Sequence, residues 1–117
     1  MNTDSETIGI SIPLGPPVLA PIGNKTVVAG KTLTFTASAT DPNPGDTLTY
    51  SLDAASLALG MKIDPNSGAF KWTPGLTQAG KTFTVTVTVT DGSGLTDSET
   101  IKIAVQKAIA IRSIKLP

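Results

Sequence analysis

The segment Thr82–Thr90 alternates threonine with an apolar residue, and the apolar positions are Phe83, Val85, Val87 and Val89. Successive side chains of a β-strand point to opposite faces, so this spacing predicts a strand with one apolar and one hydroxylated face. Other segments repeat the pattern, with their apolar residues at Leu33, Phe35, Ala37 and Ala39, at Leu48, Tyr50 and Leu52, at Phe70 and Trp72, and at Ile101, Ile103 and Val105. We predict an all-β, Greek-key sandwich of about seven strands in two antiparallel sheets.

Turn-forming residues separate these strands. Asp, Asn, Pro and Gly dominate residues 41–46, 64–68 and 91–94, which predicts a tight connection at each. Pro21 and Gly23 interrupt the first strand, as is typical at a sheet edge. Residues 53–60 lack clean alternation and leave room for one helical turn at most.

The hexapeptide Thr-Asp-Ser-Glu-Thr-Ile occurs twice, starting at Thr3 and at Thr96, 93 residues apart. Each copy leads into alternating apolar residues, which in the first copy are Ile8, Ile10 and Ile12. Self-similarity at a fixed period is typical of repeat arrays. We therefore predict that residues 1–12 are the final strand of a preceding repeat, 13–17 a Pro-rich linker, 18–106 a complete domain and 107–117 a C-terminal tail.

Two kinds of partner follow from this organisation. Neighbouring repeats of the same chain are expected to contact the domain at its ends. The strand within residues 3–12 would have lost its own sandwich, and an unpaired strand tends to pair with another sheet edge. A strand-swapped or strand-added dimer through residues 3–12 is a further hypothesis.

Composition argues against several functions. Nine basic and nine acidic residues give no net charge, so electrostatic attraction to nucleic acid is not expected. The chain contains no His and no Cys, which removes the commonest general base and any thiolate metal site. A hydrolase would need paired carboxylates in a cleft, whereas the acids lie in turns or on one strand. We therefore expect that the chain is not an enzyme.

The sequence contains no membrane-spanning segment and no signal peptide by pattern. No apolar run reaches the roughly 20 residues of a transmembrane helix. The polar start is not a signal peptide, so any export signal would lie elsewhere in a longer chain.

Two predicted loops carry hard oxygen donors. Asp41, Asn43 and Asp46 follow one strand, and Asp91 follows the long Thr/Val strand. In a Greek-key sandwich these loops lie at the same end, and Ca²⁺ takes about 6–8 oxygen ligands. These four residues are candidate ligands of a Ca²⁺ site that is weak or shared with a neighbouring module. The structural alternative is that they only form turns and cap their own amides.

The remaining polar and aromatic residues have simpler interpretations. Asp64 and Asn66 fit a hairpin turn, and Asp97 and Glu99 fit solvating charges that protect an edge strand from aggregation. All five aromatic residues are in phase with apolar strand faces. Trp72 lies on a short predicted strand. It is the aromatic residue that could be partly exposed and so contact a sugar ring.

Four blocks in the same order resemble a known family: residues 39–52, 60–74, 79–80 and 85–92. From about residue 18 to 105 the chain is similar to the Ig/cadherin-like (dystroglycan-type) domain of bacterial surface and secreted repeat proteins. The family's Leu-Pro-x-Gly block reads Leu57-Ala-Leu-Gly60 here. The resemblance implies an extracellular or cell-surface, seven-stranded Ig-like/cadherin-like β-sandwich within a larger exported protein. The acidic linker and the Leu-Asp-Arg-Glu motif of true cadherins are missing, so tight calcium binding is not expected.

We therefore predict a non-catalytic spacer or adhesion module of a tandem array, either without a metal or stiffened by calcium. A partner could be a surface protein or a polysaccharide. The alternative is a carbohydrate-binding module of a secreted polysaccharide-active protein.

Overall fold

A computed structural model describes residues 15–43 and 45–108 of the chain. The predicted preceding strand at 1–12, the first two residues of the linker, the strand-addition hypothesis for residues 3–12 and the tail from residue 109 lie outside these residues. The elements, in order, are β1 (Val18–Leu19), β2 (Lys25–Val28), β3 (Leu33–Thr36), β4 (Ala39–Thr40), β5 (Thr49–Leu52), α1 (Ala54–Ala58), β6 (Lys62–Ile63), β7 (Ala69–Trp72), the 3₁₀ turn η1 (Leu76–Gln78), β8 (Thr82–Thr90) and β9 (Thr96–Gln106).

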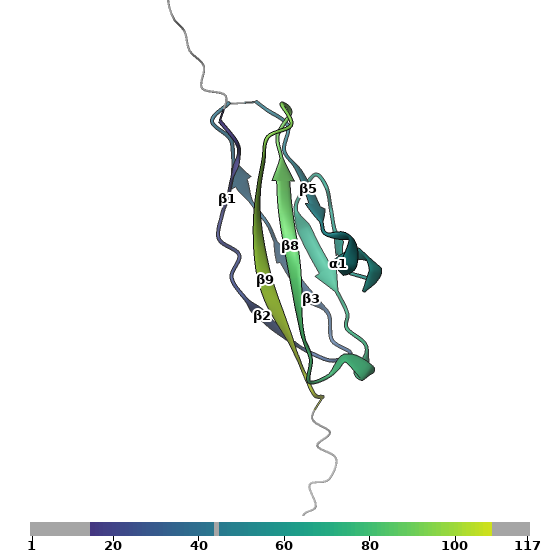
Figure 1. Ribbon diagram of the computed structural model, residues 1–117. Coiled ribbons are helices and arrows are strands. Elements are labelled where there is room, and N and C mark those ends of the chain that lie inside the picture. The colour runs from purple at the N-terminus through teal and green to yellow at the C-terminus, as the bar shows by residue number, and fades with distance from the viewer. Residues whose placement is uncertain (1–14, 44, 109–117) are drawn as a thin grey trace, which may run out of the picture.

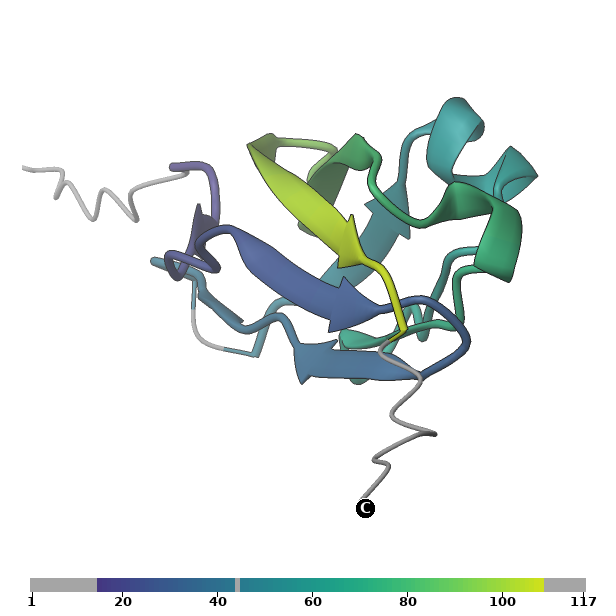
Figure 2. The same ribbon diagram turned by 90° about the horizontal axis from the view of Figure 1, so that it is seen from below.

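The strands form two layers around one interior (Figures 1 and 2). One sheet has the order β2-β9-β8-β5, the other has the order β3-β7-β6, and β1 pairs with β4. The longest ladder joins β8 to β9 in antiparallel register from Thr82 opposite Ala104 to Thr90 opposite Thr96. The predicted all-β sandwich is confirmed, and its first and last described residues lie at opposite ends of the molecule (Figure 1).

Two of the predicted strands are divided in the structure. The first becomes β1 and β2, because the chain turns at Pro21 and Gly23 and crosses to the other sheet; Gly23 has a φ of 80°. There β2 runs parallel to β9, so the expectation of purely antiparallel sheets is wrong at this edge. The second divided strand becomes β3 and β4, where the Ala37 N–H donates to the carbonyl of Gly68.

The core consists of the apolar positions that the alternation singles out. Val87, Val89 and Ile103 are 0% exposed, whereas the threonines at alternate positions of β8 face solvent or are half-buried. Trp72 is 2% exposed, and its indole N–H donates to the carbonyl of Leu59 at 3.1 Å. The ring is therefore part of the core. The fully and largely buried apolar residues are Leu19, Val27, Ala29, Ala37, Tyr50, Leu52, Met61, Phe70, Trp72, Val85, Val87, Val89, Ile101, Ile103 and Val105.

The helix α1 is a short connection between the sheets. Asp53 caps it, since its carboxylate accepts hydrogen bonds from the backbone N–H and the hydroxyl of Ser56. No helix among residues 15–43 and 45–108 is long and apolar enough to cross a membrane.

Candidate metal centre

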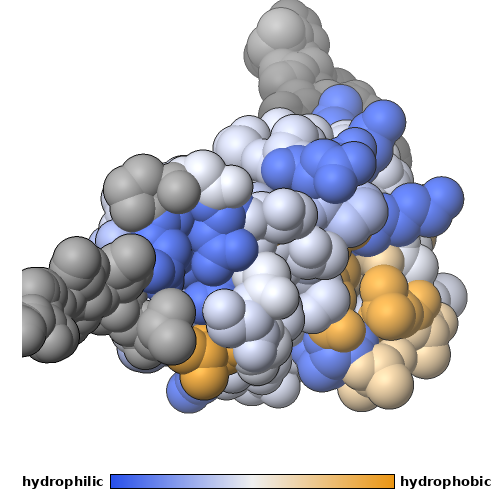
Figure 3. Space-filling model, turned by 90° about the horizontal axis from the view of Figure 1, so that it is seen from above, coloured by the Kyte–Doolittle hydropathy of each residue, from blue (hydrophilic) through white to orange (hydrophobic). Residues whose placement is uncertain are grey.

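The loop at 41–46 and the β8–β9 hairpin meet at the end of the molecule where the described chain starts (Figure 1). Hydrophilic residues are prominent on this end, and the few hydrophobic ones lie toward its margin (Figure 3). The two loops are joined directly, because the Gly92 N–H donates to Asp46 Oδ1 at 3.0 Å. The predicted placement of both loops at one end of the sandwich is therefore confirmed.

Asp41 follows β4 and shapes its own loop. Its Oδ1 accepts a hydrogen bond from the backbone N–H of Asn43 at 2.7 Å, a turn that Asp forms readily. Its Oδ2 is buried and has no hydrogen-bond partner among the described residues. Only half of this carboxylate is therefore used by the turn.

Asp91 repeats this arrangement in the β8–β9 hairpin. The residue is 5% exposed, and its Oδ1 accepts hydrogen bonds from the N–H groups of Ser93 and Leu95, both at 2.9 Å. Its Oδ2 is again buried without a partner in the described part of the chain.

Asp46 lies between the two loops. Its Oδ1 accepts hydrogen bonds from Thr47 and Gly92, both at 3.0 Å. Gly92 permits this contact, because a Cβ at residue 92 would overlap Asp46 Oδ1. In the sequence, the Asp-Gly turn is the one signal that points to Gly92.

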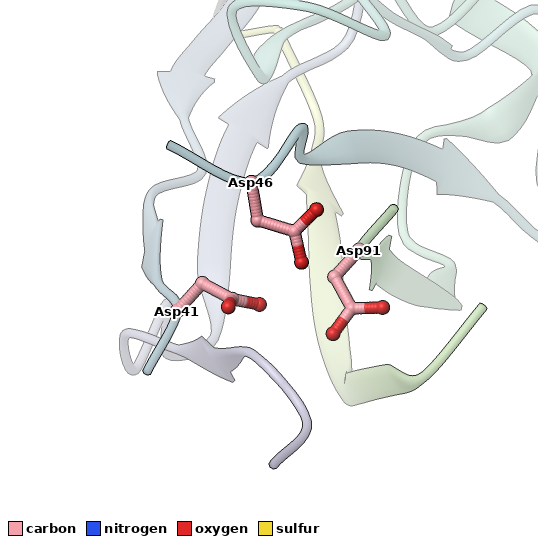
Figure 4. A group of neighbouring side chains, drawn as sticks. All are labelled: Asp41, Asp46 and Asp91. Atoms are coloured by element: carbon pink, nitrogen blue, oxygen red, sulfur yellow. The ribbon is translucent and has the colours of Figure 1, made fainter. Parts of the chain in front are cut away.

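The three carboxylates converge (Figure 4). One oxygen from each of Asp41, Asp46 and Asp91 lies within 4.8 Å of the others. A buried carboxylate oxygen without a donor is costly, and the cost rises when other anions are close. A hard cation with oxygen ligands removes both penalties. The donor set therefore fits Ca²⁺, held by Asp41 Oδ2, Asp91 Oδ2 and the Asp46 carboxylate.

The fourth predicted ligand, Asn43, contributes to the loop through its backbone. Its N–H donates to Asp41, and its carbonyl accepts from the N–H of Asp46 at 3.1 Å. A ligand role for its side chain stays a prediction.

The other acidic residues lie away from this cluster. The Asp64 carboxylate accepts hydrogen bonds from the N–H groups of Ser67 and Asn66, which lower its pKa. The predicted hairpin turn is confirmed there.

Asp97 and Glu99 do not act as free charges on an edge strand. Asp97 accepts a hydrogen bond from the Leu19 N–H at 2.8 Å. Glu99 accepts from Ile22 and Gly23 at 2.8 and 3.2 Å. β9 lies between β2 and β8 in the sheet order, and the interpretation of these two acids as merely solvating charges is wrong. β2 pairs only with residues 103–106 of β9. Earlier in β9, where that pairing is absent, the carboxylates of Asp97 and Glu99 bind the backbone of residues 19–23 instead.

Comparisons with known proteins agree with this fold. The family model described as "Putative Ig domain" matches residues 16–106. No curated relative matches the chain. The structure of mouse cadherin-23 EC22–24 is similar, with 26% identity, a TM-score of 0.65 and coverage of 80% of this chain and 31% of that chain.

Two bacterial structures are also similar. The SrpA adhesin from Streptococcus sanguinis has 16% identity, a TM-score of 0.65 and coverage of 81% of this chain and 59% of that chain. A nucleoside hydrolase-related hypothetical protein from Saccharophagus degradans, associated with carbohydrate metabolism, has 22% identity and a TM-score of 0.61, with coverage of 79% and 26%. This chain thus spans from 26% to 59% of the length of these structures. With its cadherin-like and adhesin-like neighbours and a family match over most of its length, the chain belongs to the Putative Ig domain family.

Proposed function

We propose that this domain is a non-catalytic, extracellular adhesion or spacer module whose Asp41–Asp46–Asp91 cluster binds Ca²⁺. The observation that carries the proposal is the pair of buried carboxylate oxygens, Asp41 Oδ2 and Asp91 Oδ2, that have no donor among the described residues. Both belong to a cluster of three acids whose ligand atoms lie within 4.8 Å of one another.

Calcium would stiffen the end of the domain at which the described chain starts. Asp41 belongs to the loop after β4, and Asp91 to the hairpin between β8 and β9. A cation between them adds a cross-link beside the hydrogen bond from Gly92 to Asp46. The described chain enters and leaves at opposite ends (Figure 1), a geometry that suits a head-to-tail series of modules.

The affinity is expected to be modest. Three carboxylates supply fewer than the roughly 6–8 oxygens that Ca²⁺ takes, even if some bind through both oxygens. Water or a neighbouring module would supply the rest. Extracellular calcium modules of this kind bind with dissociation constants of about 10⁻⁴–10⁻³ M.

A non-catalytic role is supported by how the acids are used. The chain has no His and no Cys, and Asp53, Asp64, Asp97 and Glu99 all accept hydrogen bonds from backbone N–H groups. The predicted alternative, a carbohydrate-binding module, is not supported through Trp72, which is buried.

Calorimetry tests the proposal with the whole chain. In Ca²⁺ at about 100 times the dissociation constant, the folded state gains about 2.7 kcal/mol, so the Tm should rise by several degrees over its value in EDTA. Asp91→Asn keeps Oδ1 for the hairpin hydrogen bonds but loses the charge. This variant should melt at or above the wild-type Tm in EDTA and show no rise with Ca²⁺. With the dissociation constant expected here, that concentration is about 10–100 mM. Equal wild-type Tm values in EDTA and in Ca²⁺ at that concentration would contradict the proposal, as would a full calcium shift in the variant.

A further inference from the structure

A second surface carries charge that the fold leaves unneutralised. On the outer face of the β3-β7-β6 sheet, Lys62 of β6 lies directly opposite Lys71 of β7. Both are exposed. Like charges directly opposite each other in an antiparallel pair destabilise the sheet. An anion bound between the two ammonium groups would remove that penalty.

The carboxylates of the domain are occupied elsewhere. All seven acids among the described residues accept hydrogen bonds from backbone N–H groups. In that part of the chain, none of these acids accepts a hydrogen bond from a lysine. The seven are Asp41, Asp46, Asp53, Asp64, Asp91, Asp97 and Glu99. The nearest to the lysine pair in sequence is Asp64, whose Oδ1 binds the N–H groups of its own turn. The acids therefore serve the fold and leave both lysines without a hydrogen-bonded carboxylate among the described residues, although the Asp64 carboxylate lines the same hollow and reduces its positive charge.

Two hollows share the lysine pair. The larger has a volume of about 510 Å³. Its exposed lining residues are Thr34, Thr36, Lys62, Asp64, Ala69 and Lys71, and half-buried Phe35 and Ile63 and buried Phe70 complete the lining. The smaller, of about 300 Å³, is lined by Gly60, Thr73 and Trp72 together with the same two lysines. Since Ala69 and Thr73 lie on either side of Lys71 in the sequence, the two hollows are neighbours along β7. We call the two together the Lys62–Lys71 trough. Its larger hollow falls within the size range of small-ligand sites.

The chemistry of the lining selects the ligand. Two ammonium groups bind carboxylates through charge-assisted hydrogen bonds. The hydroxyls of Thr34, Thr36 and Thr73 can both donate hydrogen bonds to ligand hydroxyls and accept hydrogen bonds from them. Single-stranded nucleic acid relies on exposed aromatic rings for stacking and on many phosphate contacts. Phe70 and Trp72 of this sheet are buried, and the third ring, Phe35, is half-buried and stacked on Phe70. We propose that the Lys62–Lys71 trough binds an acidic polysaccharide, with the lysines on its carboxylates and the threonines on its hydroxyls.

Binding of the full chain to polygalacturonate, in EDTA and at low salt, tests this proposal independently of the calcium site. The fully methyl-esterified polymer is the matched neutral probe and should not bind. Lys62→Gln with Lys71→Gln should weaken binding about tenfold or more, because two charge-assisted contacts are lost. Asp64→Asn, which keeps the turn acceptor, should strengthen binding because it removes the carboxylate in the trough.

The control is the double variant Lys81→Gln with Lys102→Gln, which removes the same charge from exposed positions outside the trough. The affinity of this control variant for polygalacturonate should be within about twofold of the wild-type affinity, as expected when the removed charges do not contact the ligand. The proposal is overturned if wild type does not bind polygalacturonate, or if both double variants lose affinity equally. Tighter binding of poly-dT or polyglutamate with the same dependence on Lys62 and Lys71 would also overturn it, in favour of another class of partner.

Discussion

Gly92 allows the β8–β9 hairpin to approach the Asp46 carboxylate. A methyl group at residue 92 would overlap Asp46 Oδ1, so Gly92→Ala should turn the Asp46 carboxylate away and break the hydrogen bond that it accepts from the N–H of residue 92. Because only the end of one side chain has to move, we expect a loss of about 0.5–1.5 kcal/mol in the free energy of unfolding, the usual net value of a hydrogen bond, together with a weaker calcium shift. Denaturant unfolding with and without Ca²⁺ measures both.

Ser93→Ala is the matched control for this variant. Ser93 is an exposed neighbour in the same hairpin and binds Asp91 only through its backbone N–H. Its substitution should change stability by less than about 0.5 kcal/mol. Equal effects of the two substitutions would mean that the close approach of Gly92 to Asp46 is unimportant.

Asp53 links the stability of the domain to pH. Partial burial favours a higher pKa for its carboxyl, but hydrogen bonds from Thr86 and Ser56 outweigh this and lower the pKa below the ordinary value of 3.8. A lowered folded-state pKa stabilises the protein above the unfolded-state pKa, and this contribution is lost as the pH falls through the folded-state value. Wild type should therefore be more stable than Asp53→Asn at neutral pH. The difference should disappear in acid below that folded-state pKa, as measured by urea unfolding across the pH series. A difference that stays constant with pH would contradict the charge-based explanation.

Much of the candidate site could be predicted from residue types. Asp41, Asp46 and Asp91 lie in turns that strand alternation places at one end of a sandwich, and the structure brings all three together. The sequence could not reveal which oxygens remain free. Which oxygens remain free depends on which backbone N–H groups donate to each carboxylate. The hydrogen bond from Gly92 to Asp46, for example, joins residues that are 46 positions apart in the sequence.

At the scale of elements, Asp97 and Glu99 fasten the segment between β1 and β2 to β9. Their carboxylates accept three backbone hydrogen bonds, from Leu19, Ile22 and Gly23. Hydrogen bonds to charged groups contribute about 1.5–3 kcal/mol each. Replacing both acids by Ala should therefore accelerate amide exchange at these three positions by tenfold or more.

The exchange experiment has an internal reference. The amides of Val85 and Val87 lie in the β8–β9 ladder, and in the double variant they should exchange only as fast as its lower global stability requires. Unchanged exchange at Leu19, Ile22 and Gly23 would show that the carboxylates do not hold the segment.

The alternation of apolar and polar residues identified the strands because it records which face each residue takes. The apolar positions predicted for residues 82–90 and 101–105 are buried or half-buried in β8 and β9. Alternation carries no information on partners, however. It could not reveal that β2 leaves β1 to run parallel to β9, nor that Asp97 and Glu99 face the backbone of residues 19–23, because both depend on contacts between segments more than 70 positions apart.

For the molecule as a whole, stability depends on one apolar interior shared by both sheets. Ile103 is 0% exposed and lies opposite Phe83 in the β8–β9 ladder. Ile103→Ala should therefore cost about 2–5 kcal/mol, a large part of the roughly 5–15 kcal/mol that stabilises a typical domain. Thr84→Ala, on the exposed side of β8 opposite Lys102, should cost less than about 0.5 kcal/mol.

The same pair of variants separates the core from the metal centre. Ile103 is not one of the residues of the Asp41–Asp46–Asp91 cluster. Ile103→Ala should therefore lower the Tm in EDTA and in Ca²⁺ while leaving the calcium-dependent gain in free energy unchanged. Because the interior is continuous, a single unfolding transition should remain, since removing one side chain weakens both sheets together. If instead the calorimetric trace divides into two transitions, the sheets are stabilised separately, and Ca²⁺ should then raise only the transition of the sheet that contains β8 and β9.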